Sequence, residues 1–145
     1  MILKYTSIFA LVVAVLGIAL LINKDYLFSS NPFAITIQIL AGGLMLWSRI
    51  TFGFRSFHAA ANTTEGELVT KGPYSVLRHP IYASLIYFFW ACVISYPFIE
   101  TIAAVILITA GLFARMLIEE KFLLATYPEY SAYSKRTWRV IPYLF

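Results

Sequence analysis

The sequence predicts an all-α protein that crosses a membrane several times. Of its 145 residues, 61% are hydrophobic and only 12% are charged, a balance that a soluble domain of this size could hardly cover with polar surface. The chain also contains several apolar runs close to the ~20 residues that a membrane-spanning helix requires. These runs take up most of the chain, so we expect a single membrane domain over residues 1–145.

Four apolar runs are the predicted membrane spans. Turn-forming residues follow the first run, and Pro97 separates the third run from the fourth. The first run is long and no small-residue cleavage site follows it, so we interpret it as a retained span rather than a signal peptide. The first two spans are expected to form a hairpin, and a very short turn is expected between the last two. The spans cover residues 5–22, 33–52, 81–96 and 99–118.

Two segments are more polar than the spans. Residues 53–80 are predicted to be a long loop, and loops of this length are usually functional or disordered. Residues 119–145 follow the last span, and from Glu119 to Tyr133 apolar and aromatic side chains alternate with charged ones. This pattern predicts a C-terminal amphipathic helix at the membrane interface, broken near Pro128.

Basic residues are distributed unevenly about the predicted spans. Four spans place both termini and the 53–80 loop on one side, and Lys24 is the only basic residue on the other. This asymmetry predicts that the termini and the loop are cytoplasmic. The remaining Lys and Arg residues are Lys4, Arg49, Arg55, Lys71, Arg78, Arg115, Lys121, Lys135, Arg136 and Arg139.

The same composition argues against several classes of function. The basic residues flank apolar segments instead of gathering on a polar surface, so the net charge of +4 does not indicate nucleic-acid binding. Two histidines and the lone Cys92, without ligand spacing, predict no metal site. A Gly-rich phosphate loop after a strand is also missing from the sequence, which argues against a Rossmann-type nucleotide domain.

The first candidate for chemistry is the run Arg78-His79-Pro80-Ile81-Tyr82. Pro80 suits the first turn of a helix, which places Arg78 and His79 directly before its N-terminus. Free N–H groups at such an end can receive a carboxylate. Spacing alone equally allows the alternative that Arg78 and His79 are interfacial anchors and Tyr82 an aromatic-belt residue.

The second candidate is Arg115 with Glu119, which share a helical face and can pair. A charge deep in the bilayer costs about 2.5–3.5 kcal/mol, whereas a surface pair returns less than about 1 kcal/mol. We therefore expect this pair to serve a ligand rather than stability. His58, Trp138 and Arg139 are interpreted as a loop histidine and interfacial anchors.

These motifs occur together in an ordered pattern. With them, the sequence resembles the superfamily of isoprenylcysteine carboxyl methyltransferases and phospholipid methyltransferases, over residues 68–142. The motifs are Gly72-Pro73-Tyr74-Ser75-Val76-Leu77-Arg78-His79-Pro80-Ile81-Tyr82, Arg115-x-x-x-Glu119-Glu120-Lys121-Phe122-Leu123 and Tyr127-x-x-Tyr130-x-x-Tyr133.

The resemblance implies a site for S-adenosyl-L-methionine at the cytosolic face. Its catalytic residues would be Arg115, which contacts the acceptor, and Glu119, which closes the cofactor pocket. Ser84 replaces the glycine usual in the family, and a polar residue of the eukaryotic branch has no counterpart within residues 59–62. The remaining cofactor-binding residues implied by the resemblance are Leu68, Val69, Tyr74, His79 and Tyr82.

The predicted function is S-adenosylmethionine-dependent methyl transfer to a lipophilic acceptor at the cytosolic face of the membrane. The acceptor is an isoprenylcysteine-like carboxylate, a lipid, or a small hydrophobic amine or thiol. A nicotinamide-dependent membrane reductase is one alternative, although few basic residues are available in the loop for dinucleotide phosphates. A non-catalytic membrane scaffold is the other, although Gly42-Gly43 and Gly111 do not form the GxxxG spacing of a dedicated helix-pairing face.

Overall fold

The structure is a computed structural model that describes residues 2–53 and 67–145. Within that part of the chain it contains helices and no strand, as predicted. The helices are α1 (Ile2–Asn23), α2 (Pro32–Phe52), the 3-10 helix η2 (Gly72–Ser75), α3 (Pro80–Ser95), α4 (Ile99–Thr126) and α5 (Tyr130–Ser134).

Local sequence signals account for the limits of the helices. The side chain of Asn31 caps α2 by accepting hydrogen bonds from the N–H groups of Phe33 and Ala34. Pro80 occupies the first turn of α3, where a missing N–H costs nothing. At the other end, α3 stops directly before Tyr96 and Pro97.

Three of the four predicted spans are helices long and apolar enough to cross a membrane: α1 from Tyr5, α2 and α4. The predicted third span is a shorter apolar helix, α3, of 16 residues, which corresponds to roughly 24 Å of helix at 1.5 Å per residue. It is short because one proline begins it and another follows its end. The predicted polytopic, all-α architecture is therefore confirmed, and the third span, predicted over residues 81–96, is the helix Pro80–Ser95, which is shorter than the other three.

The amphipathic helix expected to begin at Glu119 is not a separate element. Its first half is the end of α4, which runs through 28 residues to Thr126, because nothing between Ile118 and Thr126 interrupts a helix. The predicted break near Pro128 is confirmed, and only α5 follows it. At ~1.5 Å per residue α4 is about 42 Å long, so its last turns extend beyond a hydrocarbon core of ~30 Å.

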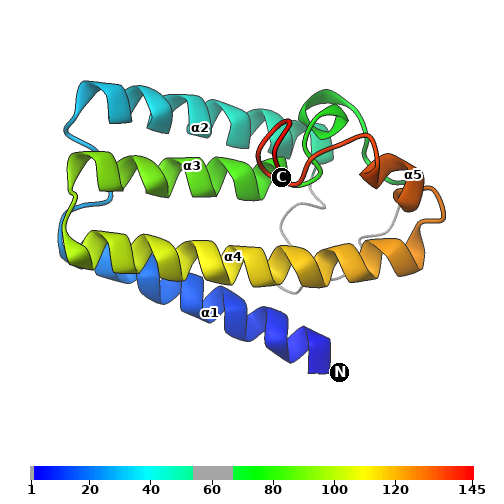
Figure 1. Cartoon of the computed structure of the whole chain (residues 1–145), viewed down its shortest axis with the longest axis horizontal. Coiled ribbons are helices and arrows are strands. Elements are labelled where there is room, and N and C mark those ends of the chain that lie inside the picture. The colour runs from blue at the N-terminus through cyan, green and yellow to red at the C-terminus, as the bar shows by residue number, and fades with distance from the viewer. Residues whose placement is uncertain (1, 54–66) are drawn as a thin grey trace.

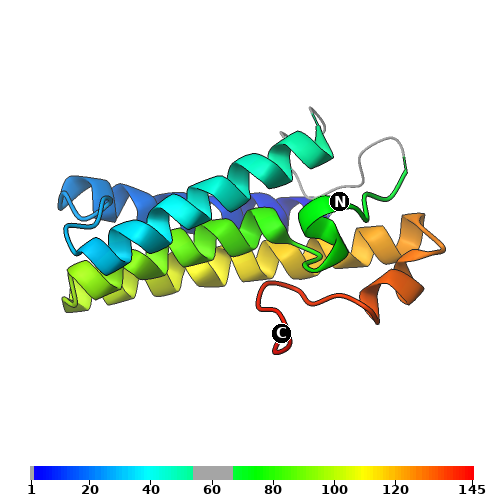
Figure 2. The ribbon, with the colours of Figure 1, turned by 90° about the horizontal axis from the view of Figure 1, so that it is seen from above.

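The helices run alongside one another, with α1 on α4, α4 on α3 and α3 on α2 (Figure 1). The predicted hairpin of the first two spans is thus only a connection in sequence, since each packs mainly on another helix. The loops after α1 and α3 lie at one end of the bundle, and η2 and α5 lie at the other (Figures 1 and 2).

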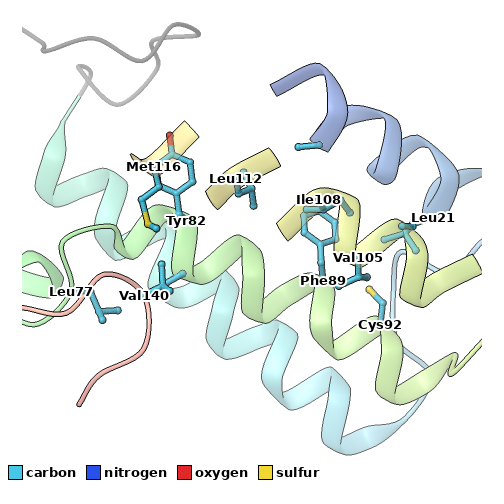
Figure 3. Close-up of a cluster of buried hydrophobic side chains, with 13 residues drawn as sticks. Leu21, Leu77, Tyr82, Phe89, Cys92, Val105, Ile108, Leu112, Met116 and Val140 are labelled. Carbon is cyan, nitrogen blue, oxygen red and sulfur yellow. The ribbon is translucent and has the colours of Figure 1, made fainter. Parts of the chain in front are cut away.

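The core is continuous along the faces that α3 and α4 turn toward each other and toward α1 (Figure 3). By contrast, large apolar side chains on the outer faces of α1 and α2 are exposed, such as Phe9 (69%) and Ile39 (68%). In a chain this apolar, those faces suit contact with lipid. Core side chains include Leu21, Phe89, Cys92, Val105, Ile108, Leu112 and Met116.

Candidate functional site

The polar residues singled out in the sequence gather at the end of the bundle that carries η2 and α5. The segment leading to it begins with Leu68 and Val69, both half-buried. Gly72 then adopts a φ of +59°, and a Cβ atom there would lie 3.0 Å from the hydroxyl oxygen of Thr51. Only glycine takes that conformation without strain and lets η2 approach the end of α2 so closely.

Tyr74 in η2 is buried between two elements. Its ring packs on that of Phe52, at 5.6 Å between centroids, and its carbonyl accepts a hydrogen bond of 2.7 Å from the hydroxyl of Tyr133 in α5. Burial raises the pKa of Tyr133 to about 12, so at neutral pH the hydroxyl keeps the proton that it donates. Tyr74 thus joins α2, η2 and α5.

Tyr82, in the first turn of α3, lies between the two charged residues of the predicted pair. Its hydroxyl accepts a hydrogen bond of 2.8 Å from Nε of Arg115 and donates one of 2.5 Å to Oε1 of Glu119. Arg115 and Glu119 also pair directly at 3.4 Å, as their spacing predicts. These three residues, hereafter the Tyr82 triad, combine a cation, a phenol and a carboxylate between α3 and α4.

Burial within the Tyr82 triad is uneven. The side chain of Arg115 is 7% exposed and that of Glu119 is 23% exposed, while Tyr82 is 8% exposed. A guanidinium that is buried requires a partner, and Glu119 with Tyr82 supplies it. The carboxylate of Glu119 is accordingly the member most accessible to a ligand.

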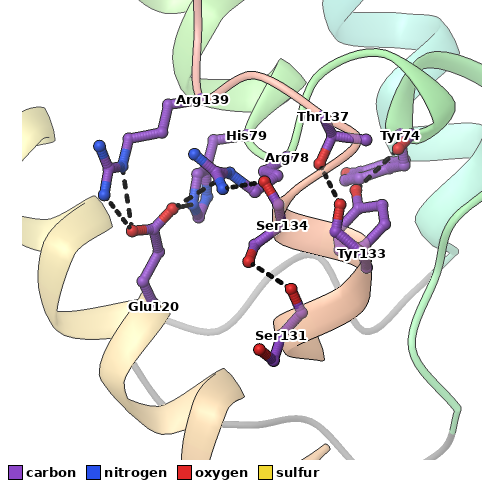
Figure 4. A network of polar contacts seen from close by, with 9 residues as sticks. All are labelled: Tyr74, Arg78, His79, Glu120, Ser131, Tyr133, Ser134, Thr137 and Arg139. Atoms are coloured by element: carbon purple, nitrogen blue, oxygen red, sulfur yellow. Dashed lines mark hydrogen bonds and ion pairs between the residues drawn. The ribbon is translucent and has the colours of Figure 1, made fainter. Parts of the chain in front are cut away.

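A second polar cluster surrounds Glu120, the neighbour of Glu119 (Figure 4). Its Oε1 lies 3.3 Å from Nε of Arg78 and 3.4 Å from Nε2 of His79. Its Oε2 accepts from Nε of Arg139 at 3.0 Å and lies 2.9 Å from Nη2 of the same guanidinium. Both oxygens of this buried carboxylate are therefore engaged, and we call these four residues the Glu120 cluster.

The Glu120 cluster exists because the C-terminal segment returns to the start of α3. Residues 76–79 pair with residues 138–139 in parallel, through a bridge between Leu77 and Trp138. The N–H groups of Arg78 and His79 donate to the carbonyls of Trp138 and Arg139 at 2.6 and 3.1 Å. The two clusters meet where the rings of His79 and Tyr82 contact each other edge to face, at 5.7 Å.

The structure thus brings together the residues of the Arg78-to-Tyr82 motif and the residues near the end of α4. From the sequence alone, no role is predicted for Glu120, and Arg139 is predicted to be an interfacial anchor. The doubled Glu119-Glu120 was the available signal for the first, and no local signal existed for the second. His58 and residues 59–62 lie outside the described residues. Among the residues described, no cluster of three or more His, Cys, Asp or Glu has the arrangement of a metal site.

The fold and this polar end define the class of protein: an all-helical, polytopic membrane protein with charged residues converging where a short helix begins. A family model described as phospholipid methyltransferase matches residues 31–130. The match covers about two thirds of the chain, and the protein belongs to the phospholipid methyltransferase family. No curated protein and no solved structure matches this chain.

Membership of this family makes the chain a methyltransferase by class. The matched region contains η2, the Tyr82 triad and Glu120, whereas α1 and residues 131–145 lie outside it. The part of the Glu120 cluster that residues 137–140 supply is therefore an addition from beyond the matched segment.

Proposed function

We propose that this protein transfers a methyl group from S-adenosylmethionine to a lipophilic acceptor at the cytoplasmic face of a membrane. The observation that carries the proposal is the Tyr82 triad, which places a paired cation and carboxylate beside the N-terminus of α3 in a chain of a methyltransferase family.

The residues present fit the chemical groups of S-adenosylmethionine. The cofactor has an amino-acid part with one ammonium and one carboxylate, and a purine ring. Glu119, the exposed member of the Tyr82 triad, suits the ammonium. The start of α3, where the N-cap residue His79 makes no capping hydrogen bond from its side chain, suits the carboxylate. Tyr74, next to the half-buried Leu68 and Val69, suits the purine.

When bound, S-adenosylmethionine would supply a methyl group activated on a positively charged sulfur. The task of the protein is then to hold the acceptor in line with that methyl group and to exclude water. Tyr82 and Arg115 would hold Glu119 in one orientation, the first through its hydrogen bond and the second through the ion pair. Arg115 would bind an anionic or polar head group of the acceptor. Glu119, which pairs with Arg115, would limit the net charge of the site.

The acceptor is proposed to enter from the lipid phase. The outer faces of α1 and α2 are apolar and exposed, and such faces suit the approach of a substrate dissolved in lipid. An isoprenylcysteine-like carboxylate, a lipid, or a small hydrophobic amine or thiol meets this condition. A carboxylate acceptor needs no general base, whereas an amine or thiol must lose a proton.

The cytoplasmic placement rests on charge. Lys71, Arg78 and Arg139 lie at the end of the bundle that carries the Tyr82 triad, and Lys24 lies at the other end. Cationic residues concentrate on the cytoplasmic side of membrane proteins. We therefore assign the site, the start of α1 and the C-terminal segment to that side.

The test is equilibrium binding of S-adenosylmethionine and, separately, of a reduced nicotinamide dinucleotide phosphate to the purified protein in detergent. We expect micromolar binding of the first ligand only, weakened about tenfold or more by Glu119→Gln, since a charge-assisted hydrogen bond contributes ~1.5–3 kcal/mol. His79→Ala should weaken it as well. The matched control is Glu100→Gln, at the opposite end of α4 and exposed.

Three other outcomes would contradict the proposed function or its proposed site. Selective binding of the nicotinamide dinucleotide would contradict the proposal in favour of a reductase. A folded protein that binds neither ligand would contradict it in favour of a scaffold. Equal weakening by Glu119→Gln and by Glu100→Gln would show that binding does not occur at the Tyr82 triad.

A further inference from the structure

The C-terminal segment contacts the candidate site in two independent ways. Its main chain pairs with residues 76–79, so that the carbonyl of Arg139 accepts from the N–H of His79 at 3.1 Å. The side chain of Arg139 reaches the same histidine indirectly, because Arg139 and His79 contact opposite oxygens of the Glu120 carboxylate. Figure 4 shows the guanidinium and the imidazole on either side of that carboxylate.

Arg139 is itself held in place from its other side. Its guanidinium lies over the ring of Phe145, 4.9 Å from the centroid, and Phe145 stacks on Phe113 of α4 at 5.6 Å. The carbonyl of Val140 also accepts a hydrogen bond from the hydroxyl of Tyr87 in α3. An arginine so packed has lost much of its rotamer freedom before it meets Glu120, so the contact costs little further order.

Glu120 needs this arginine to hold His79. The side chain of Glu120 is 11% exposed, and a buried carboxylate is retained in one orientation only when its oxygens are occupied. Arg139 occupies Oε2, which leaves Oε1 directed toward His79 and Arg78. His79 in turn contacts the ring of Tyr82, whose hydroxyl joins Arg115 and Glu119.

We propose that Arg139 is a positioning residue for S-adenosylmethionine binding, which acts through Glu120 to fix His79 and the first turn of α3. The inference rests on the proposed function and extends it to a residue outside the segment that matches the family, 31–130. Arg139 would act without touching the cofactor. The site is complete only when residues 137–140 are docked.

The experiment is a double-mutant cycle read out as equilibrium binding of S-adenosylmethionine by the full-length protein in detergent, well below the unfolding temperature of each variant. Arg139→Gln and Glu120→Gln should each weaken binding about tenfold. The double variant should bind no more than about twofold worse than the single variant that binds more weakly, because the effects of two residues that act through one contact do not add. Arg139→Lys, which keeps the charge, should be intermediate. Arg136→Gln, which alters an exposed arginine three residues away, is the matched control.

The outcomes separate this inference from the proposed function. Binding by Arg139→Gln within twofold of the wild type would overturn the inference and leave the function intact. Weakening by Arg139→Gln and Glu120→Gln that multiplies in the double variant would also overturn it, because the two residues would then act separately. An absence of binding by the folded wild type would overturn the proposed function, and this inference with it.

Discussion

At the scale of single residues, Tyr82 connects the charges that the sequence presents. Its hydroxyl is acceptor to Arg115 and donor to Glu119 at once, and so sets the spacing between a cation and a carboxylate on neighbouring turns of α4. The sequence alone left Tyr82 open to interpretation as an aromatic-belt residue. In the structure it is 8% exposed, which places its ring inside the bundle and not at the lipid interface.

Removing this hydroxyl tests the connection with little change of volume. We expect Tyr82→Phe to weaken S-adenosylmethionine binding about tenfold, because Arg115 and Glu119 each lose a buried partner, at a cost of ~1–3 kcal/mol. Binding is measured by titration and folding by the thermal unfolding temperature. Tyr5→Phe, which alters a tyrosine that is 65% exposed on α1, should change neither. Unchanged binding by Tyr82→Phe would show that the Tyr82 triad is a structural contact.

Whether a side-chain contact of the site could be predicted from the sequence depended on how far apart its two residues lie along the chain. The pairing of Arg115 with Glu119 followed from a spacing of four residues on one helix. The contacts of Glu120 with His79 and Arg139 join residues 41 and 19 positions apart. No periodicity relates such positions, so only the folded chain reveals them.

At the scale of elements, α1 and α4 approach each other closely at small residues. A Cβ atom on Gly111 would lie 2.5 Å from the carbonyl oxygen of Ala10, and one on Gly17 would lie 2.7 Å from the carbonyl oxygen of Ala104. The two backbones therefore approach each other without a GxxxG motif, because each glycine meets an alanine on the partner helix. Gly42 and Gly43 of α2, by contrast, have nothing within 4 Å of such an atom.

The same substitution on two helices tests this contact. We expect Gly111→Ala to destabilise the protein by about 1–3 kcal/mol, because the added methyl group meets backbone that can move only if α1 moves. Gly43→Ala should be neutral or stabilising by up to ~1 kcal/mol, since alanine is the better helix former and the space is open. Thermal or denaturant unfolding in detergent measures both. Equal effects at the two positions would contradict the packing of α1 on α4.

At the scale of the whole molecule, the bundle has one polar end and one end with short connections. The polar end carries η2, α5 and the two clusters, and the other carries the turns after α1 and α3 (Figure 1). Although α3 is shorter than a typical span, α4 extends past its start, so residues of both helices meet at the same depth. The site lies where the shorter helix begins.

Cysteine labelling tests the orientation of this end. Cys92 is fully buried, and in a Cys92→Ala background we expect Lys71→Cys and Lys135→Cys to react with a membrane-impermeant maleimide from the cytoplasmic side. Lys24→Cys should react only from the opposite side. Solubilised protein, in which all three exposed positions should be labelled, is the control. Labelling of Lys24→Cys and Lys71→Cys from the same side would rule out the predicted topology.

The sequence by itself determined that this is a helical membrane protein and where α1, α2 and α3 lie, and it predicted the motifs whose polar residues the structure brings together. Those properties are local, because hydropathy, helix caps and spacing of three or four residues act within one element. Tertiary structure decided that α1 packs on α4 and not on α2, and that Arg139 returns to Glu120. These contacts depend on the fit of surfaces far apart in sequence, which no single segment encodes.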